Sequence, residues 1–183
     1  MRVLAISGSL RRDSHNRRLL RAAANLLPPG VELVEFDGLK AIPNFDEDDE
    51  HTPDPAVVAL RKAIDEADVV LFATPEYNSS IPGGLKNAID WASRPFDAAV
   101  LRNKPVAVVG ASTGMFGAVW AQAELRKVLA AAGARVLDRE LPIPAAHEAF
   151  TEDGRLVEAD HHNELAAIIE ALVEEGAQRL TTV

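Results

Sequence analysis

At 183 residues, with 48% hydrophobic and 26% charged residues, the chain has the size and composition of one globular domain. Its net charge of −9 disfavours nucleic acid and anionic membranes as partners, because both are bound by clustered Lys and Arg. The chain has no cysteine, which excludes disulfides, cysteine nucleophiles, iron–sulfur clusters and thiolate zinc sites. Any redox chemistry therefore requires a bound cofactor.

The chain shows no segment that directs it to a membrane. No apolar run approaches the roughly 20 residues that a membrane helix needs. The first predicted strand begins at Arg2, which leaves no room for a signal peptide. We therefore expect a cytoplasmic protein with a single domain over residues 1–183.

In chain order, short apolar runs rich in β-branched residues alternate with segments of helical periodicity. Breaker residues such as those at 28–30 and Gly133 separate them. The predicted strands are residues 2–7, 31–36, 68–74, 105–111 and 134–141, and the predicted helices are 16–27, 54–67, 82–93, 118–132 and 160–180. The acidic run 46–50 is predicted to be a solvated loop.

Five strand–helix repeats predict an α/β fold in which right-handed crossovers build a parallel sheet with helices on both faces. Two arrangements fit this pattern, the flavodoxin-like strand order 2-1-3-4-5 and the Rossmann order. Five repeats in 183 residues favour the first, a three-layer sandwich with a five-stranded sheet. In that order, ligands bind at the carboxyl ends of strands 1, 3 and 4.

The loop after the first strand has the composition of an anion site. It leads into a helix N-terminus, where free N–H groups and the helix dipole favour an anion. Ser9, Ser14 and Asn16 add neutral hydrogen-bonding groups, and Arg11 adds a planar cation suited to phosphate. The loop matches neither the dinucleotide turn nor the nucleoside-triphosphate loop. Ser14 fits equally well as a simple helix cap.

The loop after the third strand, within residues 75–91, offers a surface for a flat ring. Tyr77 is suited to covering such a ring, while the backbone of Glu76, Tyr77 and Asn78 and the Asn78 amide can bind its polar edge. The alternative is an ordinary turn with Tyr77 in the core. After the fourth strand, the small residues Ser112, Thr113 and Gly114 allow close backbone approach to a ligand or form a plain turn.

Two of these segments carry a family resemblance. Gly8 to Asn16 matches the pattern G-S-L-R-x-x-S-x-N, and Pro75 to Trp91 matches P-E-Y-N-x-S-x-P-G-x-L-K-N-A-I-D-W at every fixed position. The chain resembles the NAD(P)H-dependent FMN reductase family of flavodoxin-like flavoproteins, which includes quinone and chromate reductases. Weaker matches extend the resemblance to nearly the whole chain.

The resemblance implies FMN as the bound cofactor, with NADPH or NADH as donor and a quinone, chromate, an azo compound or free flavin as acceptor. It implies that Ser9, Arg11, Ser14 and Asn16 hold the FMN phosphate, that Pro75, Glu76, Tyr77 and Asn78 line the isoalloxazine, and that Ser112 and Gly114 contact its pyrimidine or ribityl side. No catalytic side chain or metal site is expected, because the cofactor carries the chemistry. A homodimer or homotetramer is also implied.

The chain departs from the family pattern at one point. After Gly117 the pattern often reads Gly-x-Arg, whereas this chain has Ala118-Val119-Trp120, and we expect Trp120 to pack in a helix interface. His15 is expected to face solvent. Two other functions remain open from the residues, an electron-transfer flavoprotein reduced by a protein partner and a module that binds another phosphorylated ligand.

Overall fold

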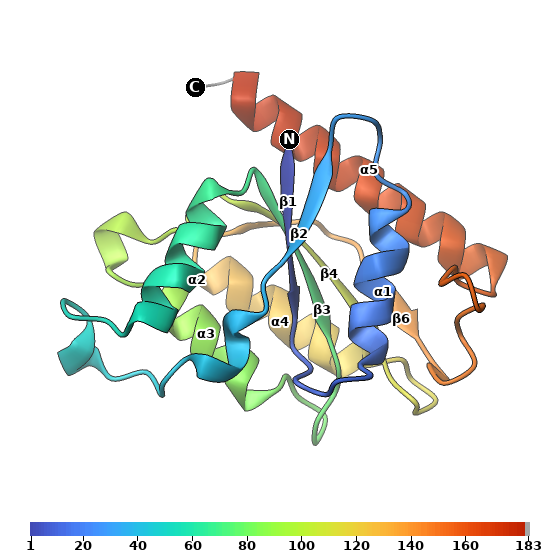
Figure 1. Cartoon of the computed structure of the whole chain (residues 1–183), viewed down its shortest axis with the longest axis horizontal. Helices are drawn as coiled ribbons and strands as arrows, with labels where there is room; N and C mark the ends of the chain where they lie inside the picture. Colours follow the sequence, from blue (N-terminus) through green and yellow to red (C-terminus); the bar gives the residue numbers. More distant parts are fainter. Residues whose placement is uncertain (182–183) are drawn as a thin grey trace.

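The computed structural model describes residues 1–181, so the last two residues of the domain predicted at 1–183 lie outside the described residues. The centre of the fold is a parallel sheet with the order β2-β1-β3-β4-β5, which confirms the predicted order (Figure 1). These strands are β1 (Arg2–Ser7), β2 (Glu32–Glu35), β3 (Val69–Thr74), β4 (Pro105–Ala111) and β5 (Arg135–Val136).

Helices cover both faces of the sheet and complete the predicted three-layer sandwich (Figure 1). On one face lie α1 (His15–Ala24) and α5 (Ala159–Thr181), and on the other lie α2 (Pro55–Glu66), α3 (Gly83–Ala92) and α4 (Val119–Ala131). Residues 1–181 also contain three short 3-10 helices, η1 (Gly38–Ala41), η2 (Glu47–Asp49) and η3 (Phe96–Ala98). The acidic run predicted as a loop therefore contains η2.

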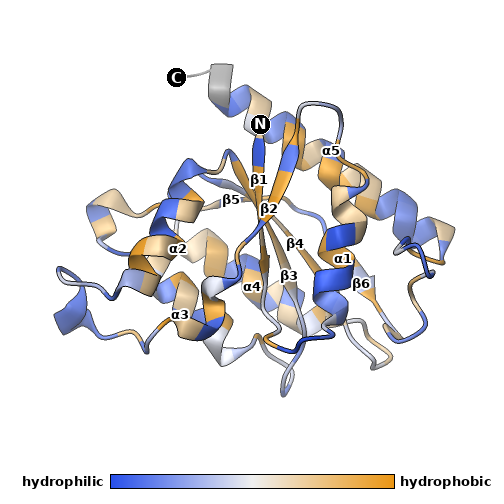
Figure 2. Ribbon diagram, in the orientation of Figure 1, coloured by the Kyte–Doolittle hydropathy of each residue, from blue (hydrophilic) through white to orange (hydrophobic). Residues whose placement is uncertain are grey.

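Alternation along the strands divides the core into two halves. Val3 and Ala5 of β1 face α1 and α5, whereas Leu4 and Ile6 face α2, α3 and α4. All residues of β3 and β4 are buried, as expected for central strands covered on both faces. Figure 2 shows these strands in predominantly hydrophobic colours, while the helices carry both colours. No helix among residues 1–181 is long and apolar enough to cross a membrane.

The strand predicted at 134–141 is wrong in its extent. Only β5 pairs with the amino-terminal part of β4, and pairing resumes at β6 (Pro142–Ile143), opposite Gly110 and Ala111. The residues between them, Asp138, Arg139 and Glu140, are exposed. Burying three consecutive charged side chains in a sheet is too costly, so the chain bulges out to solvent before it returns to β4.

Two glycines bring the carboxyl-edge loops close to their neighbours. A Cβ on Gly8 would lie 2.9 Å from the Cδ2 atom of Leu85 and 3.3 Å from the Cδ atom of Pro75, so the loops after β1 and β3 touch there. Gly117 has φ +57°, and a Cβ on it would lie 2.6 Å from the backbone of Pro142 and Ile143. Glycine is therefore required where the loop after β4 passes over β6.

Candidate active site

The loops that follow β1, β3 and β4 meet at the carboxyl edge of the sheet, along the lower side of Figure 1. They enclose an open cleft of about 210 Å³. The cleft is lined by Ser9, Arg11, His15, Asn16, Pro75, Glu76, Tyr77, Ala111, Ser112 and Thr113. This is the position at which the strand order reverses, where α/β sheets of this topology bind ligands.

The loop after β1 presents free hydrogen-bond donors to the cleft edge. Ser14 caps α1 by accepting a hydrogen bond from the Arg17 N–H at 3.3 Å, and the Ser9 Oγ accepts from the Arg11 N–H at 3.4 Å. Both hydroxyl hydrogens stay available to a ligand. Within residues 1–181, the backbone N–H groups of Asp13, His15 and Asn16 have no hydrogen-bond acceptor, and residues 12–13 form a turn before the helix. Consecutive free N–H groups at a helix start form an anion-binding geometry.

Asn16 lines the cleft, and its side chain is held in place by hydrogen bonds within the chain. Its side chain is 2% exposed and spans to the end of β4, where Nδ2 donates to the Ala111 carbonyl at 3.0 Å and Oδ1 accepts from the Ala111 N–H at 2.9 Å. The amide therefore ties α1 to β4 and fixes the spacing between the first and third loops of the cleft.

The loop after β3 forms a small hairpin. Tyr77 and Ser80 exchange two backbone hydrogen bonds, at 2.9 and 3.1 Å, around Asn78 and Ser79, whose φ angles are +53° and +60°. Two consecutive positive φ values are those of a type I′ turn, which Asn tolerates well. The hairpin holds Tyr77 half-exposed at the cleft, at 50%, so the alternative of Tyr77 in the core is wrong.

Glu76 joins the second loop to the helix that follows β4. Its Oε2 accepts hydrogen bonds from the backbone N–H groups of Trp120 and Ala121, both at 3.1 Å. The residue before α4, Ala118, supplies no side-chain cap. A carboxylate at a helix N-terminus satisfies free donors and favours the helix dipole. The Glu76 side chain is thus a distant cap, while its backbone stays at the cleft.

The third loop is fixed by the segment after β6. The Ser112 N–H donates to the Ile143 carbonyl at 3.0 Å, and the Ser112 carbonyl accepts from the Ala146 N–H at 3.0 Å. The Ser112 Oγ accepts from the Gly114 N–H at 3.1 Å, which leaves its hydroxyl hydrogen free. Gly114 itself is exposed and lies outside the cleft lining.

The second half of the long motif has a structural role. Asn87 accepts a hydrogen bond from the Phe45 N–H at 2.7 Å and donates to the Pro43 carbonyl at 2.8 Å. The indole of Trp91, itself 1% exposed, donates to the same Pro43 carbonyl at 2.9 Å. These contacts hold the segment after η1 against α3. Within the motif, the first half is therefore the part that is available to contact a ligand.

His15 is the residue that sequence reasoning misplaced. Its Nδ1 atom is buried and has no hydrogen-bond partner in the described structure, and the side chain lines the cleft instead of facing solvent. Burial, followed by repulsion from Arg11, Arg18 and His147, lowers the pKa of His15. The position of His15 directly after the Ser14 cap was the available signal, since the first helical residue adjoins any anion bound there.

Seven of the ten predicted site residues lie together in the cleft, and three lie beside it. The seven are Ser9, Arg11, Asn16, Pro75, Glu76, Tyr77 and Ser112, and the three are Ser14, Asn78 and Gly114. Besides His15, Ala111 and Thr113 also line the cleft. Neither was singled out as a ligand, because the side chains of Ala and Thr carry no distinctive recognition chemistry.

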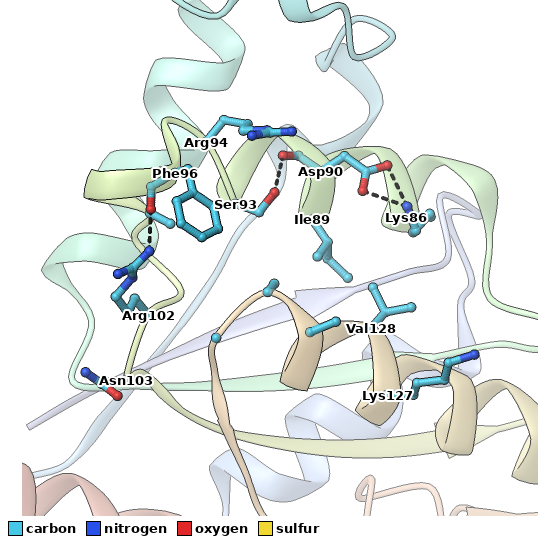
Figure 3. A pocket seen from close by; sticks show the side chains of 14 residues that line it. Lys86, Ile89, Asp90, Ser93, Arg94, Phe96, Arg102, Asn103, Lys127 and Val128 are labelled. Carbon is cyan, nitrogen blue, oxygen red and sulfur yellow. Dashed lines mark hydrogen bonds and ion pairs between the residues drawn. The ribbon is translucent and has the colours of Figure 1, made fainter.

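A larger groove lies away from these loops, between α3 and α4 (Figure 3). It has a volume of about 820 Å³, with Ile89 and Val128 at its centre and the cations Arg94, Arg102 and Lys127 around it. It shares no residue with the cleft at the sheet edge. Several of its polar groups are engaged with their own chain, as in the ion pair of Lys86 with Asp90 at 2.6 Å.

Large apolar side chains are exposed next to the cleft. Phe116 is 56% exposed and packs edge-to-face on Trp120, with 4.8 Å between the ring centroids, and Met115 is 81% exposed. Trp120 is 48% exposed, so it does not fill an interface within the described chain. We call Met115, Phe116 and Trp120 the aromatic rim.

The family model described as NADPH-dependent FMN reductase matches residues 1–148. The chain is 45% identical over 160 residues to an NAD(P)H-dependent FMN reductase of Pseudomonas aeruginosa, covering 86% of this chain and 85% of that one. It is 38% identical over 179 residues to an NAD(P)H:quinone oxidoreductase of Solanum tuberosum, covering 94% and 91%.

A solved structure gives the same result. The chain superposes on a flavoenzyme NAD(P)H:(acceptor) oxidoreductase of Paracoccus denitrificans with a TM-score of 0.84 and 33% identity, covering 97% of each chain. FMN and a reduced nicotinamide are therefore confirmed as the cofactors, and the chain is an FMN-dependent oxidoreductase. These agreements in sequence and in fold show that the chain belongs to the NADPH-dependent FMN reductase family.

Proposed function

We propose that this protein takes hydride from NAD(P)H onto FMN held in the carboxyl-edge cleft and passes the electrons to a small quinone-type acceptor. The observation that carries the location is the set of unpaired backbone N–H groups beside the cleft, those of Asp13, His15 and Asn16. A phosphate oxygen is the group that such donors accommodate. The residues present therefore fit FMN.

Arg11, Ser9 and Ser14 hold the phosphate in this proposal. The Arg11 side chain is exposed and its Nη2 donates to the Asp13 carbonyl, but no carboxylate lies within ion-pair distance of it among residues 1–181, so its charge is not neutralised by the chain. Asn16 contributes by positioning, since its two bonds to Ala111 set the cleft width. Residues 1–183 act here as one FMN-binding domain.

The hairpin after β3 lies where the ring would be covered. Tyr77 supplies an aromatic surface, and the backbone of Pro75, Glu76 and Asn78 lies beside its polar edge. Ser112 and Gly114 approach from the opposite loop. Bound FMN supplies the hydride-transfer chemistry, so the side chains are assigned to binding and orientation, with no proton-transfer role.

A quinone is proposed as the acceptor because it is flat and apolar with two polar oxygens. The half-exposed Tyr77 and the aromatic rim offer surfaces of this kind next to the cleft. Two similar proteins are named for quinone substrates, a 2-hydroxy-1,4-benzoquinone reductase of a Burkholderia species and the Solanum enzyme. A cytoplasmic location is proposed with it, since NAD(P)H is supplied there.

The first test is an anaerobic absorbance spectrum of the FMN-loaded protein before and after one equivalent of NADPH, and separately of NADH. Bleaching of the flavin bands within turnover time, followed by recovery when benzoquinone is added, is expected. A flavin that neither donor bleaches would instead support an electron carrier reduced by a protein partner.

A homodimer in which a second copy covers the aromatic rim is proposed as the assembly. Exposed aromatic side chains next to a ligand cleft are typical of an interface surface. The substitution Trp120→Glu should shift the mass measured by light scattering toward the monomer. Val58→Glu is the matched control, because Val58 is 50% exposed on α2, away from the rim. An unchanged mass for Trp120→Glu would place the interface elsewhere.

A further inference from the structure

The first turn of α1 has a charge pattern that opposes the helix dipole. It contains His15, Arg17 and Arg18 and no acidic residue. The N-terminal end of a helix carries partial positive charge, so cations there are unfavourable. Residues that are locally unfavourable for the stability of the fold are expected at functional sites. An anion bound at this turn would remove the conflict.

The two arginines of this turn have other contacts. Arg17 forms an ion pair with Asp37 at 2.8 Å, and the guanidinium of Arg18 lies 4.7 Å from the centre of the Phe150 ring. The Nε of Arg17 and the Nδ1 of His15 are both buried without a hydrogen-bond partner in the described structure, but of these three residues only His15 lines the cleft. A buried polar atom without a hydrogen bond is unfavourable, so a ligand that forms a hydrogen bond with the Nδ1 of His15 would gain affinity.

We propose that His15 donates a hydrogen bond from Nδ1 to the phosphate of FMN, and that FMN binding is coupled to uptake of a proton by this imidazole. The inference rests on the proposed placement of the phosphate at the loop after β1. His15 would be a binding residue specific to the phosphate, additional to Arg11, Ser9 and Ser14.

The charges that face His15 come from several elements. Arg11 of the loop, Arg18 of α1 and His147 of the segment after β6 all repel the imidazolium. Glu76 shares the cleft, but its carboxylate is bound to the α4 N–H groups, and Glu148 pairs with His147 at 3.5 Å. Without a ligand, these surroundings therefore disfavour the protonated imidazole of His15.

A bound phosphate reverses this balance. Its negative charge lies against the imidazole and raises the pKa of His15 above the lowered value of the free protein. The complex then holds one proton that the free protein lacks, over the pH range between these two pKa values. FMN affinity should therefore increase as pH falls from 8.0 to 6.5, with a limiting slope of about tenfold per pH unit.

The test is calorimetric titration of the full chain, freed of FMN and checked for native circular dichroism, with FMN at pH 7.5 in two buffers that differ in ionisation enthalpy. The parent protein should take up a substantial fraction of one proton per FMN. Its dissociation constant should fall at least about fivefold from pH 8.0 to 6.5. In His15→Gln both effects should disappear, while the exposed control His51→Gln should match the parent.

Two further titrations separate the possible failures. Riboflavin lacks the phosphate, so its binding should show no proton uptake and no dependence on His15. His147→Gln should keep the proton uptake, since that histidine is not in the cleft lining. Equal proton uptake by the parent and His15→Gln, no uptake by the parent, or the same pH dependence with riboflavin would overturn the inference. A parent protein that binds no FMN would overturn the proposed function itself.

Discussion

Two regions of the molecule gather cations, the small cleft at the carboxyl edge and the larger groove between α3 and α4. Among the described residues of these two regions, only the cleft lining includes a buried side-chain nitrogen without a hydrogen-bond partner. In the groove, Lys86 is paired with Asp90, and the Arg102 guanidinium donates to the Phe96 carbonyl and lies 5.0 Å from the centre of that ring. At the cleft, free backbone N–H groups adjoin the unpaired Nδ1 of His15.

The cleft and the groove differ in whether their buried polar atoms have hydrogen-bond partners, and this difference does not follow from their size. The groove has about 820 Å³ and the cleft about 210 Å³, yet no buried side-chain nitrogen or oxygen of the groove lining lacks a hydrogen-bond partner in the described structure. A ligand gains most where donors have lost water without finding a partner. Unpaired donors identify the binding site here better than volume or net cationic charge.

The largest expected effect is on FMN affinity in Arg11→Ala. Removing a charge-assisted hydrogen bond should weaken binding by about 1.5–3 kcal/mol, which is roughly 10- to 150-fold in the dissociation constant. Flavin fluorescence quenching measures this constant. The matched control in the groove, Arg102→Ala, should stay within about twofold of the parent. Comparable losses in both variants would mean that the groove, too, contributes to FMN binding.

Asn16→Leu should lower the free energy of unfolding by about 1–3 kcal/mol, because the N–H and carbonyl of Ala111 would remain buried without partners. Urea denaturation followed by circular dichroism measures the change. Lys127→Ala, an exposed position in the groove, should change stability by less than about 0.5 kcal/mol. A stable Asn16→Leu variant with normal FMN affinity would contradict the positioning role.

Glu76→Ala should cost about 1 kcal/mol of stability, the usual effect of losing a helix N-cap. Hydrogen exchange should locate the loss in the first turn of α4, with faster exchange at Trp120 and Ala121. The exposed Glu47→Ala serves as the control and should leave α4 unchanged. Unaltered exchange in Glu76→Ala would show that α4 does not depend on this carboxylate.

The smallest effect is expected at the Lys86–Asp90 pair, an i,i+4 contact on the surface of α3. A double-mutant cycle with alanine at both positions should give a coupling of about 0.3–0.5 kcal/mol, and FMN affinity should not change. Chemical denaturation of the four proteins provides the cycle. A change in FMN affinity would contradict the separation of the groove from the cleft.

Much of the fold follows from local sequence pattern. The predicted bounds of β1 and β4 agree with the structure at both ends. Each strand is an apolar run with a clear boundary, since a Gly-containing loop follows β1 and a proline begins β4. The prediction of the fifth strand was wrong in its extent, because the charged residues at 138–140 interrupt the strand. Its pairing with β4 also depends on which edge of the sheet is free.

The sequence also predicts which loops form the site, because the carboxyl ends of parallel strands share one edge. It does not predict which side chains already form hydrogen bonds within the folded chain. Asn16 lies in a motif that predicts phosphate binding, but its side chain forms hydrogen bonds with the backbone of Ala111, 95 residues away in the sequence. Glu76 caps a helix that begins 43 residues later, at Val119. Contacts between residues so far apart in the sequence produce no periodic or local sequence pattern.

By itself, the sequence determined the alternation of strands and helices, the strand order, the FMN reductase motifs and the sheet edge at which we propose that the cofactor binds. Only the tertiary structure decided that Asn16 and Glu76 tie the loops together, that Trp120 stays exposed, and that His15 is left with an unpaired buried nitrogen. Strand and helix patterns depend on neighbouring residues, whereas burial and hydrogen-bond satisfaction are set by segments that meet only when the chain has folded.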